Sequence, residues 1–143
     1  MLDSKPTQSD QNGGPTTQAT DQVYDLLIVG GGPAGLTAAI YAGRAALKTL
    51  LFAGAVPGGQ IATTDRVENY PGFPEGISGA ELAQRLHAQA EHFVGATVAD
   101  FVTEVEFSSS PFTVKTHSQT YQGRAAIIAT GAFPRRLGVP GEK

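Results

Sequence analysis

The stretch Tyr24-Asp25-Leu26-Leu27-Ile28-Val29-Gly30-Gly31-Gly32-Pro33-Ala34-Gly35 decides the fold of this chain. Four consecutive apolar residues, typical of a strand buried on both faces, run directly into a glycine turn of the form G-x-G-x-x-G. Small and apolar residues at helical spacing follow. The order predicts a strand over residues 24–29, a tight turn and a helix over residues 33–46, which is the arrangement of a dinucleotide-binding βαβ turn.

Each glycine of this turn suits a pyrophosphate ligand. Gly30 lets the chain leave the strand sharply, Gly32 lets the backbone approach a phosphate, and Gly35 lets the helix pack closely on the strand. The free N–H groups at the helix start, together with the helix dipole, attract negative charge. A purely structural turn without a ligand is the alternative. The cofactor-binding residues predicted here are Gly30, Gly31, Gly32, Pro33, Ala34 and Gly35.

One group expected in this pattern is missing. Dinucleotide sites usually carry Asp or Glu at the end of the second strand, where the carboxylate binds the ribose hydroxyls. The second strand, predicted over residues 48–52, ends instead in Ala53-Gly54. We therefore expect that other groups hold the ribose, or that this contact is lost.

Composition excludes several classes of function. The chain has 143 residues, enough for one domain with a core, and its net charge of -3 argues against a nucleic-acid surface. It has no cysteine, so it carries no disulfide, thiolate metal site or cysteine redox chemistry of its own. No apolar stretch approaches the roughly 18 residues of a membrane span, and the first residues do not resemble a signal peptide. We expect a cytoplasmic protein with neither a metal site nor a catalytic residue in this chain.

The order of polar and apolar segments predicts the domain boundaries. Residues 1–22 are almost entirely polar, Gly or Pro, and are predicted to be a disordered tail before a domain over residues 23–143. A long irregular segment over residues 53–78 is predicted to be functional. Ser78-Gly79-Ala80-Glu81 has the form of a capping box that starts a helix. The apolar stripe of this helix is Leu82, Leu86, Ala90 and Phe93.

The second half of the chain reads as strands. Residues 98–102, 105–107, 112–116 and 120–122 alternate in the way expected of an antiparallel meander. Residues 125–129 form a continuous apolar run, which predicts a central parallel strand. This strand ends in the small-residue turn Thr130-Gly131-Ala132, at the edge of the sheet where open α/β folds bind ligands.

Three further motifs show a family resemblance. They are Pro57-Gly58-Gly59-Gln60, the ten-residue stretch VENYPGFPEG over residues 67–76, and Ala129-Thr130-Gly131-Ala132, which leads into LGVPGE over residues 137–142. With the glycine turn, they make residues 24–143 resemble the flavin domain of thioredoxin reductases, in the pyridine nucleotide–disulfide oxidoreductase superfamily. The implied fold class is α/β: a Rossmann-like FAD-binding domain with a parallel sheet and a small antiparallel β-meander, incomplete at its C-terminus.

The resemblance implies FAD bound in an extended pose. Gln60 matches a glutamine that contacts the flavin half, and Asn69 matches an asparagine that reaches the isoalloxazine region. Val102 occupies a strand position whose backbone holds the adenine. For Gln60 and Asn69, capping of the loop is the structural alternative. Beyond the glycine turn, the implied cofactor-binding residues are Gly59, Gln60, Asn69, Val102, Ala129, Thr130 and Gly131.

The resemblance also implies what lies outside this chain. In a complete family member, NADPH reduces FAD, which reduces a disulfide; a second domain binds NADPH and carries a Cys-x-x-Cys pair, and a returning segment closes the flavin site. The implied partners are thioredoxin or a similar disulfide protein, and a second copy of the chain in a homodimer. We expect a catalytically incomplete portion of such an enzyme. The alternatives are a stand-alone FAD-binding or partner-docking module, and part of a ferredoxin-dependent or dithiol-oxidising relative.

Overall fold

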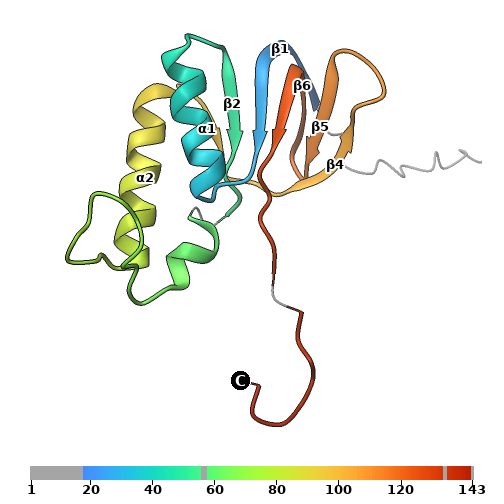
Figure 1. Cartoon of the computed structure of the whole chain (residues 1–143). Coiled ribbons are helices and arrows are strands. Elements are labelled where there is room, and N and C mark those ends of the chain that lie inside the picture. The colour runs from blue at the N-terminus through green and yellow to red at the C-terminus, as the bar shows by residue number, and fades with distance from the viewer. Residues whose placement is uncertain (1–17, 56–57, 134, 143) are drawn as a thin grey trace, which may run out of the picture.

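The computed structural model describes residues 18–55, 58–133 and 135–142. Two helices cover one face of a six-stranded sheet whose strand order is β3-β2-β1-β6-β5-β4 (Figure 1). This arrangement confirms the predicted α/β class with parallel and antiparallel parts. Most of the predicted disordered tail, residues 1–17, lies outside the described residues.

Four strands form the parallel part of the sheet. β1 (Gln18–Val29) pairs with β2 (Thr49–Phe52) on one side and with β6 (Gln119–Ile128) on the other, and β3 (Thr97–Val98) adds to β2. Successive side chains of β1 point to opposite faces, so Leu26 and Ile28 join the core under the helices. The intervening Leu27 and Val29 join a second core on the opposite face. The apolar run is therefore buried on both sides, as predicted.

The helices α1 (Pro33–Arg44) and α2 (Gly79–Phe93) pack side by side against this sheet. A Cβ added at Gly43 of α1 would lie 2.4 Å from the backbone oxygen of Phe93, so the absence of a side chain at Gly43 permits the close approach. The predicted start of α2 is confirmed, because the Ser78 side chain accepts a hydrogen bond from the Glu81 amide over 3.3 Å. The reciprocal bond of a capping box is replaced by an ion pair between Glu81 and Arg85.

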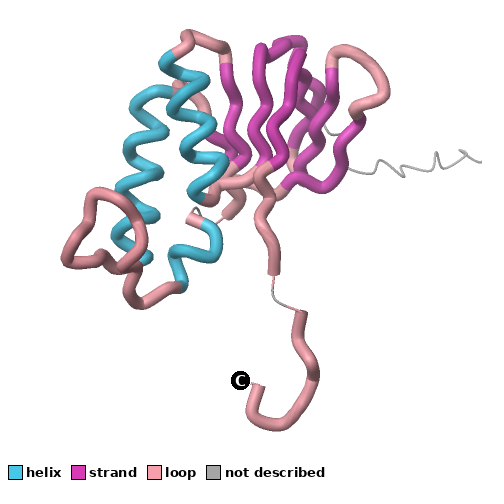
Figure 2. The backbone as a smooth tube through the Cα atoms, viewed as in Figure 1, coloured by secondary structure: helices cyan, strands magenta, loops and turns pink. Residues whose placement is uncertain are grey.

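An antiparallel meander forms the other end of the same sheet. β4 (Val102–Glu106) pairs with β5 (Phe112–Thr116), which pairs with the first half of β6. Figure 2 shows helices gathered on one side and this strand-rich part on the other. The second core lies here, with Phe52 and Tyr121 in edge-to-face contact at 5.2 Å between ring centroids.

Three elements differ from their predicted bounds. β1 begins at Gln18 rather than at residue 24, because Gln18 and Ala19 pair with the start of β6. Residues 99–101 are not strand; the chain leaves β3 after Val98 and crosses to β4. The expected strands at 120–122 and 125–129 are one continuous strand, β6. Tertiary pairing, which a local pattern does not contain, sets all three boundaries.

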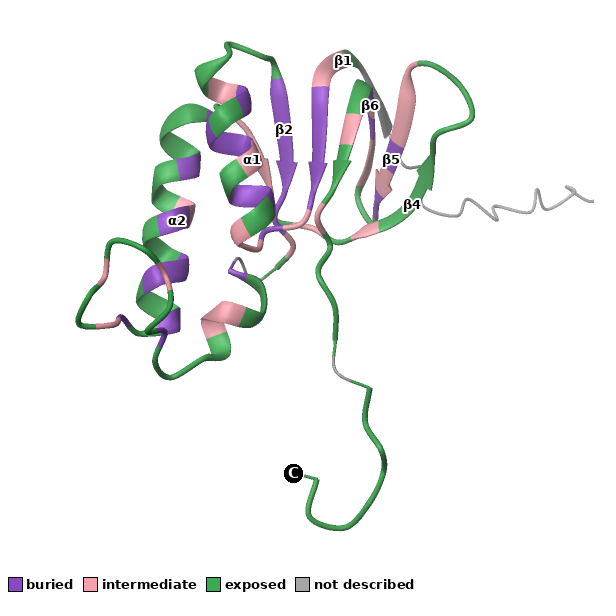
Figure 3. Cartoon of the chain, viewed as in Figure 1, coloured by how far each residue is buried: buried purple, intermediate pink, exposed green. Residues whose placement is uncertain are grey.

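The last part of β6 is less buried than a central strand is expected to be. β5 pairs with β6 only as far as Gly123, so Ile127 and Ile128 remain 38% and 54% exposed. The described residues after β6 form no helix or strand and are largely exposed, as Figure 3 shows. Phe93 is likewise 37% exposed, so it does not complete the predicted apolar stripe of α2. Among the described helices, none has the length and apolar character needed to cross a bilayer.

Candidate functional site

The glycine turn lies at the carboxyl ends of the parallel strands, in close contact with the backbone that follows β2 and β6. A Cβ added at Gly30 would meet the backbone oxygen of Ala129 at 2.1 Å, and one added at Gly31 would meet that of Ala53 at 2.3 Å. Gly30 also has a positive φ of 129°, which favours glycine. The turn therefore fits closely between the end of β2 and the end of β6, and no residue with a side chain fits at either position.

The remaining two glycines of the motif have different surroundings. At Gly35 an added Cβ would lie 1.9 Å from the backbone oxygen of Gly30, so this position brings α1 close to the strand end. At Gly32 the nearest heavy atom would be the Cα of Gly59, 4.0 Å away, which leaves open space. Gly32 is the N-cap of α1, and no side chain caps this helix end in the part of the chain that the structure describes. Uncapped N–H groups beside an open space suit an anionic ligand.

A second glycine-rich segment packs directly on this turn. The Gly58 amide donates a hydrogen bond to the Gly31 carbonyl over 2.7 Å. Gly59 starts the short 3-10 helix η1 (Gly59–Thr63) with a positive φ of 59°, and a Cβ there would lie 3.2 Å from the Cα of Gly32. The long segment over residues 53–78 is therefore not free of the sheet: its glycines form one wall of the space beside Gly32.

Gln60 connects this wall to the third motif. Its Nε2 donates a hydrogen bond to the Ala132 carbonyl, which lies 72 residues further along the chain. Ala129 is itself fixed by donating its amide to the Val29 carbonyl over 2.8 Å. The structure thus brings together most of the predicted site at one edge of the sheet, namely Gly30, Gly31, Gly32, Pro33, Ala34, Gly35, Gly59, Gln60, Ala129, Thr130 and Gly131.

Two predicted residues are not connected to this cluster. Asn69 is exposed in the loop before α2, and within the described residues its side chain makes no hydrogen bond. Val102 begins β4, where it pairs with Thr116 and packs against the second core. A role for either in binding a cofactor stays a prediction.

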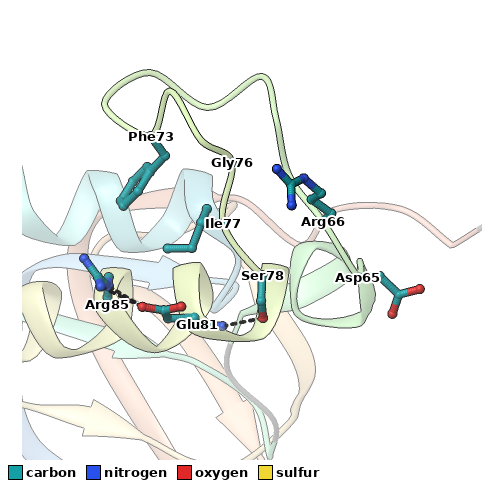
Figure 4. Close-up of a pocket in the computed structure, with 8 residues that line it drawn as sticks. All are labelled: Asp65, Arg66, Phe73, Gly76, Ile77, Ser78, Glu81 and Arg85. Carbon is teal, nitrogen blue, oxygen red and sulfur yellow. Dashed lines mark hydrogen bonds and ion pairs between the residues drawn. The ribbon is translucent and has the colours of Figure 1, made fainter.

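A pocket of about 400 Å³ lies elsewhere, between the 65–78 loop and the start of α2 (Figure 4). None of the predicted cofactor-binding residues lines it. Its charged side chains largely pair within the loop and helix: Arg66 with Glu68, and Arg85 with Glu81, while the Arg85 guanidinium also lies 5.6 Å from the centroid of the Phe73 ring. We interpret it as a surface depression, lined by contacts that hold the loop against α2.

The titratable groups near the site are few. No cluster of three or more His, Cys, Asp or Glu suited to a metal ion occurs in the described ranges. Asp100, between β3 and β4, accepts hydrogen bonds from the Ser118 hydroxyl over 2.9 Å and from the Phe101 amide over 2.7 Å. Hydrogen bonding by the Thr116 hydroxyl, and then by Ser118, holds the pKa of Asp100 well below its usual range.

Two groups at this edge were not among the predicted site residues. The Ala132 carbonyl, the partner of Gln60, belongs to the small-residue turn, but only the fold brings it to Gln60. Phe101 is 58% exposed, and its ring lies against Gly54 just after β2. The sequence around Phe101 predicts a strand, and no motif there indicates that the residue lies beside the predicted cofactor site.

Comparison with known proteins gives a consistent result. The model of a family described as pyridine nucleotide-disulphide oxidoreductase matches residues 24–143. Thioredoxin reductases of Chlamydia pneumoniae and Mycolicibacterium smegmatis are each 50% identical, over 81% and 85% of this chain. The chain spans only 38% and 39% of the length of these two relatives.

Solved structures agree with this match. The thioredoxin reductase of Lactococcus lactis, in a form called the FR conformation, superposes with a TM-score of 0.76 at 42% identity and covers 82% of this chain. That of Streptococcus pyogenes superposes with a TM-score of 0.77 at 42% identity and covers 85%. The alignments include 39% and 40% of those two chains.

Proposed function

This chain belongs to the pyridine nucleotide-disulphide oxidoreductase family, and from that premise we propose that it binds FAD at the carboxyl edge of its parallel strands. The observation that carries the proposal is the junction of two glycine-rich segments with the small-residue turn after β6. Gly31 and Gly32 pack against Gly58 and Gly59, and Gln60 ties them to the turn after β6. Such a junction supplies backbone donors and open space where dinucleotides bind in this class of fold.

Each part of the junction has a proposed role. The open space at Gly32 and the uncapped start of α1 receive the pyrophosphate, because the N–H groups of Ala34 and Gly35 are available there. Gln60 and Asn69 contact the flavin half, since an amide both donates and accepts hydrogen bonds, as flavin carbonyls and nitrogens require. Thr130 and Gly131, together with the Val102 backbone, hold the adenosine half.

The reaction we propose for the whole protein is that of a thioredoxin reductase. When bound, FAD supplies a two-electron relay between NADPH and a disulfide. This chain has no cysteine, so none of its 143 residues supplies the dithiol of that reaction. The role of this chain is to hold and orient the flavin. NADPH, a thioredoxin-like disulfide protein and a second copy of the chain are the proposed partners of the whole enzyme.

Flavin binding tests the proposal directly. The purified chain is mixed with excess FAD, passed through a gel-filtration column, and examined for flavin absorbance in the protein peak. We expect FAD to co-elute and FMN, which lacks the second phosphate and the adenosine, to separate. A colourless protein peak with intact circular dichroism would contradict FAD binding by this chain.

A second candidate is a partner-docking module without catalysis of its own. The observation that favours it is a run of exposed apolar side chains at the end of β6 and beyond: Ile127, Ile128, Phe133, Leu137 and Val139. Exposed apolar surface of this kind favours association with other polypeptides. Sedimentation velocity tests self-association through this surface, because a chain that stays monomeric with and without FAD does not dock on a second copy of itself.

A further inference from the structure

The end of β2 lacks the acidic side chain that binds ribose in many dinucleotide sites. Ala53 and Gly54 stand there, and Ala53 is buried with its backbone against Gly31. The carboxylate on the adjoining segment, Asp100, is already engaged. Its Oδ2 accepts from Ser118, and its Oδ1 accepts from the Phe101 amide and lies 3.2 Å from Nδ1 of His117. The end of β2 therefore has no carboxylate for a ribose hydroxyl, and the nearby carboxylate of Asp100 already has hydrogen-bond partners on both oxygens.

An aromatic ring lies at the place where that carboxylate would act. The segment between β3 and β4 runs along the carboxyl edge of the parallel strands, as Figure 1 shows. It brings Phe101 against Gly54, where an added Cβ would lie 3.6 Å from Cε1 and 3.9 Å from Cδ1 of the ring. Gly54 has a positive φ of 73°, so the turn itself favours glycine at this contact. Phe101 is 58% exposed as a residue, so it is accessible to a ligand.

We propose that Phe101 stacks on the adenine of FAD and replaces the ribose-binding carboxylate as the main adenosine contact. This inference rests on the proposed function, because it assigns the adenosine end of the same site. Stacking on an aromatic ring is favourable for a planar base and does not depend on ribose hydroxyls. The binding site therefore recognises the adenine face and does not recognise the 2′-hydroxyl.

Two measurable consequences follow for the full chain. FAD affinity, measured by quenching of flavin fluorescence, falls about ten-fold or more in Phe101→Ala, which removes a stack of ordinary strength. Phe101→Trp keeps the affinity, since a larger ring stacks equally well. An FAD analogue that lacks the adenosine 2′-hydroxyl binds wild-type protein within about three-fold of FAD, because no charged group is left without its partner.

Phe107→Ala is the matched control, because Phe107 is an exposed aromatic just after β4 that contacts Phe112 instead. Circular dichroism of each variant establishes that it is folded. Unchanged FAD affinity in a folded Phe101→Ala would overturn the inference while leaving FAD binding itself intact. A ten-fold preference for FAD over the 2′-deoxy analogue would also overturn it. If wild-type protein binds no FAD, the proposed function fails first and this inference fails with it.

Discussion

The amide of Gly58 donates a hydrogen bond to the carbonyl of Gly31 over 2.7 Å. This bond fastens the start of η1 to the turn that follows β1, although a helix and a strand separate the two residues in sequence. Both residues are buried. The bond places Gly59 over Gly32 and leaves Gln60 within reach of Ala132, so it sets the shape of the proposed FAD site.

The two adjacent glycines of the turn respond differently to substitution. In Gly31→Ala the new methyl group meets the Ala53 backbone, which cannot move without disturbing β2. We expect the free energy of unfolding to fall by about 2 kcal/mol or more. In Gly32→Ala the methyl group enters open space, and the cost stays below about 1 kcal/mol, the loss of a glycine N-cap. Urea denaturation of both variants measures the difference, and equal stabilities would contradict the described packing.

Gln60→Ala tests the bond between η1 and the turn after β6. The side chain is exposed, so the loss of one hydrogen bond lowers the free energy of unfolding by only about 0.5–1.5 kcal/mol. FAD affinity falls by a larger factor, because the proposed flavin contact and the position of the 129–132 turn are both lost. Gln89→Ala, an exposed substitution on α2, is the control. A variant that loses stability but keeps full FAD affinity would limit Gln60 to a structural role.

The contact between the helices predicts a reversal of the usual helix propensity. Alanine in a helix is ordinarily more stable than glycine by about 1 kcal/mol. In Gly43→Ala, however, the methyl group meets the Phe93 carbonyl of α2, so we expect net destabilisation by about 1–3 kcal/mol. Gly95→Ala is the control, because nothing lies within 4 Å of a Cβ there. A stabilised Gly43→Ala in thermal unfolding would show that the helices are further apart.

The lowered pKa of the Asp100 carboxyl predicts a pH dependence of stability. Its pKa in the folded chain lies well below the usual value of 3.8, chiefly through the Thr116 hydroxyl. A depressed pKa stabilises the folded state above the unfolded pKa, and this contribution is lost as the pH falls below about 4. We expect Asp100→Asn to flatten the acid limb of a plot of unfolding free energy against pH. Asp65→Asn, at an exposed loop position, serves as the control. An acid limb unchanged in Asp100→Asn would exclude this role.

The strand–turn–helix core could be predicted from the sequence because its signals are local. Leu26 to Val29 are a continuous apolar run, the glycines follow at fixed spacing, and Ser78 caps α2 at the predicted place. The apolar run is needed for burial on both faces, the glycines are needed where backbones approach closely, and the serine hydroxyl satisfies a free helix amide. Local chemistry and the final fold therefore agree at these elements.

Long-range pairing set the features that the sequence did not reveal. β1 starts early because Gln18 and Ala19 find partners in β6, and Ile128 is exposed because β5 stops pairing at Gly123. The contact between Phe101 and Gly54 depends on how the chain crosses from β3 to β4. Neither periodicity nor propensity contains such information. Only the family resemblance implies that Asn69 and Val102 contact the cofactor, and these roles stay predictions.

The central claim is that the open space at Gly32 receives the pyrophosphate of FAD. The most direct test is the FAD dissociation constant of wild-type chain and Gly32→Ala, measured by flavin fluorescence with the fold of each checked by circular dichroism. We predict that wild-type chain binds FAD and that Gly32→Ala, equally folded, binds at least ten-fold more weakly, because its methyl group occupies the phosphate position. Equal FAD affinity in the two folded proteins would contradict the claim.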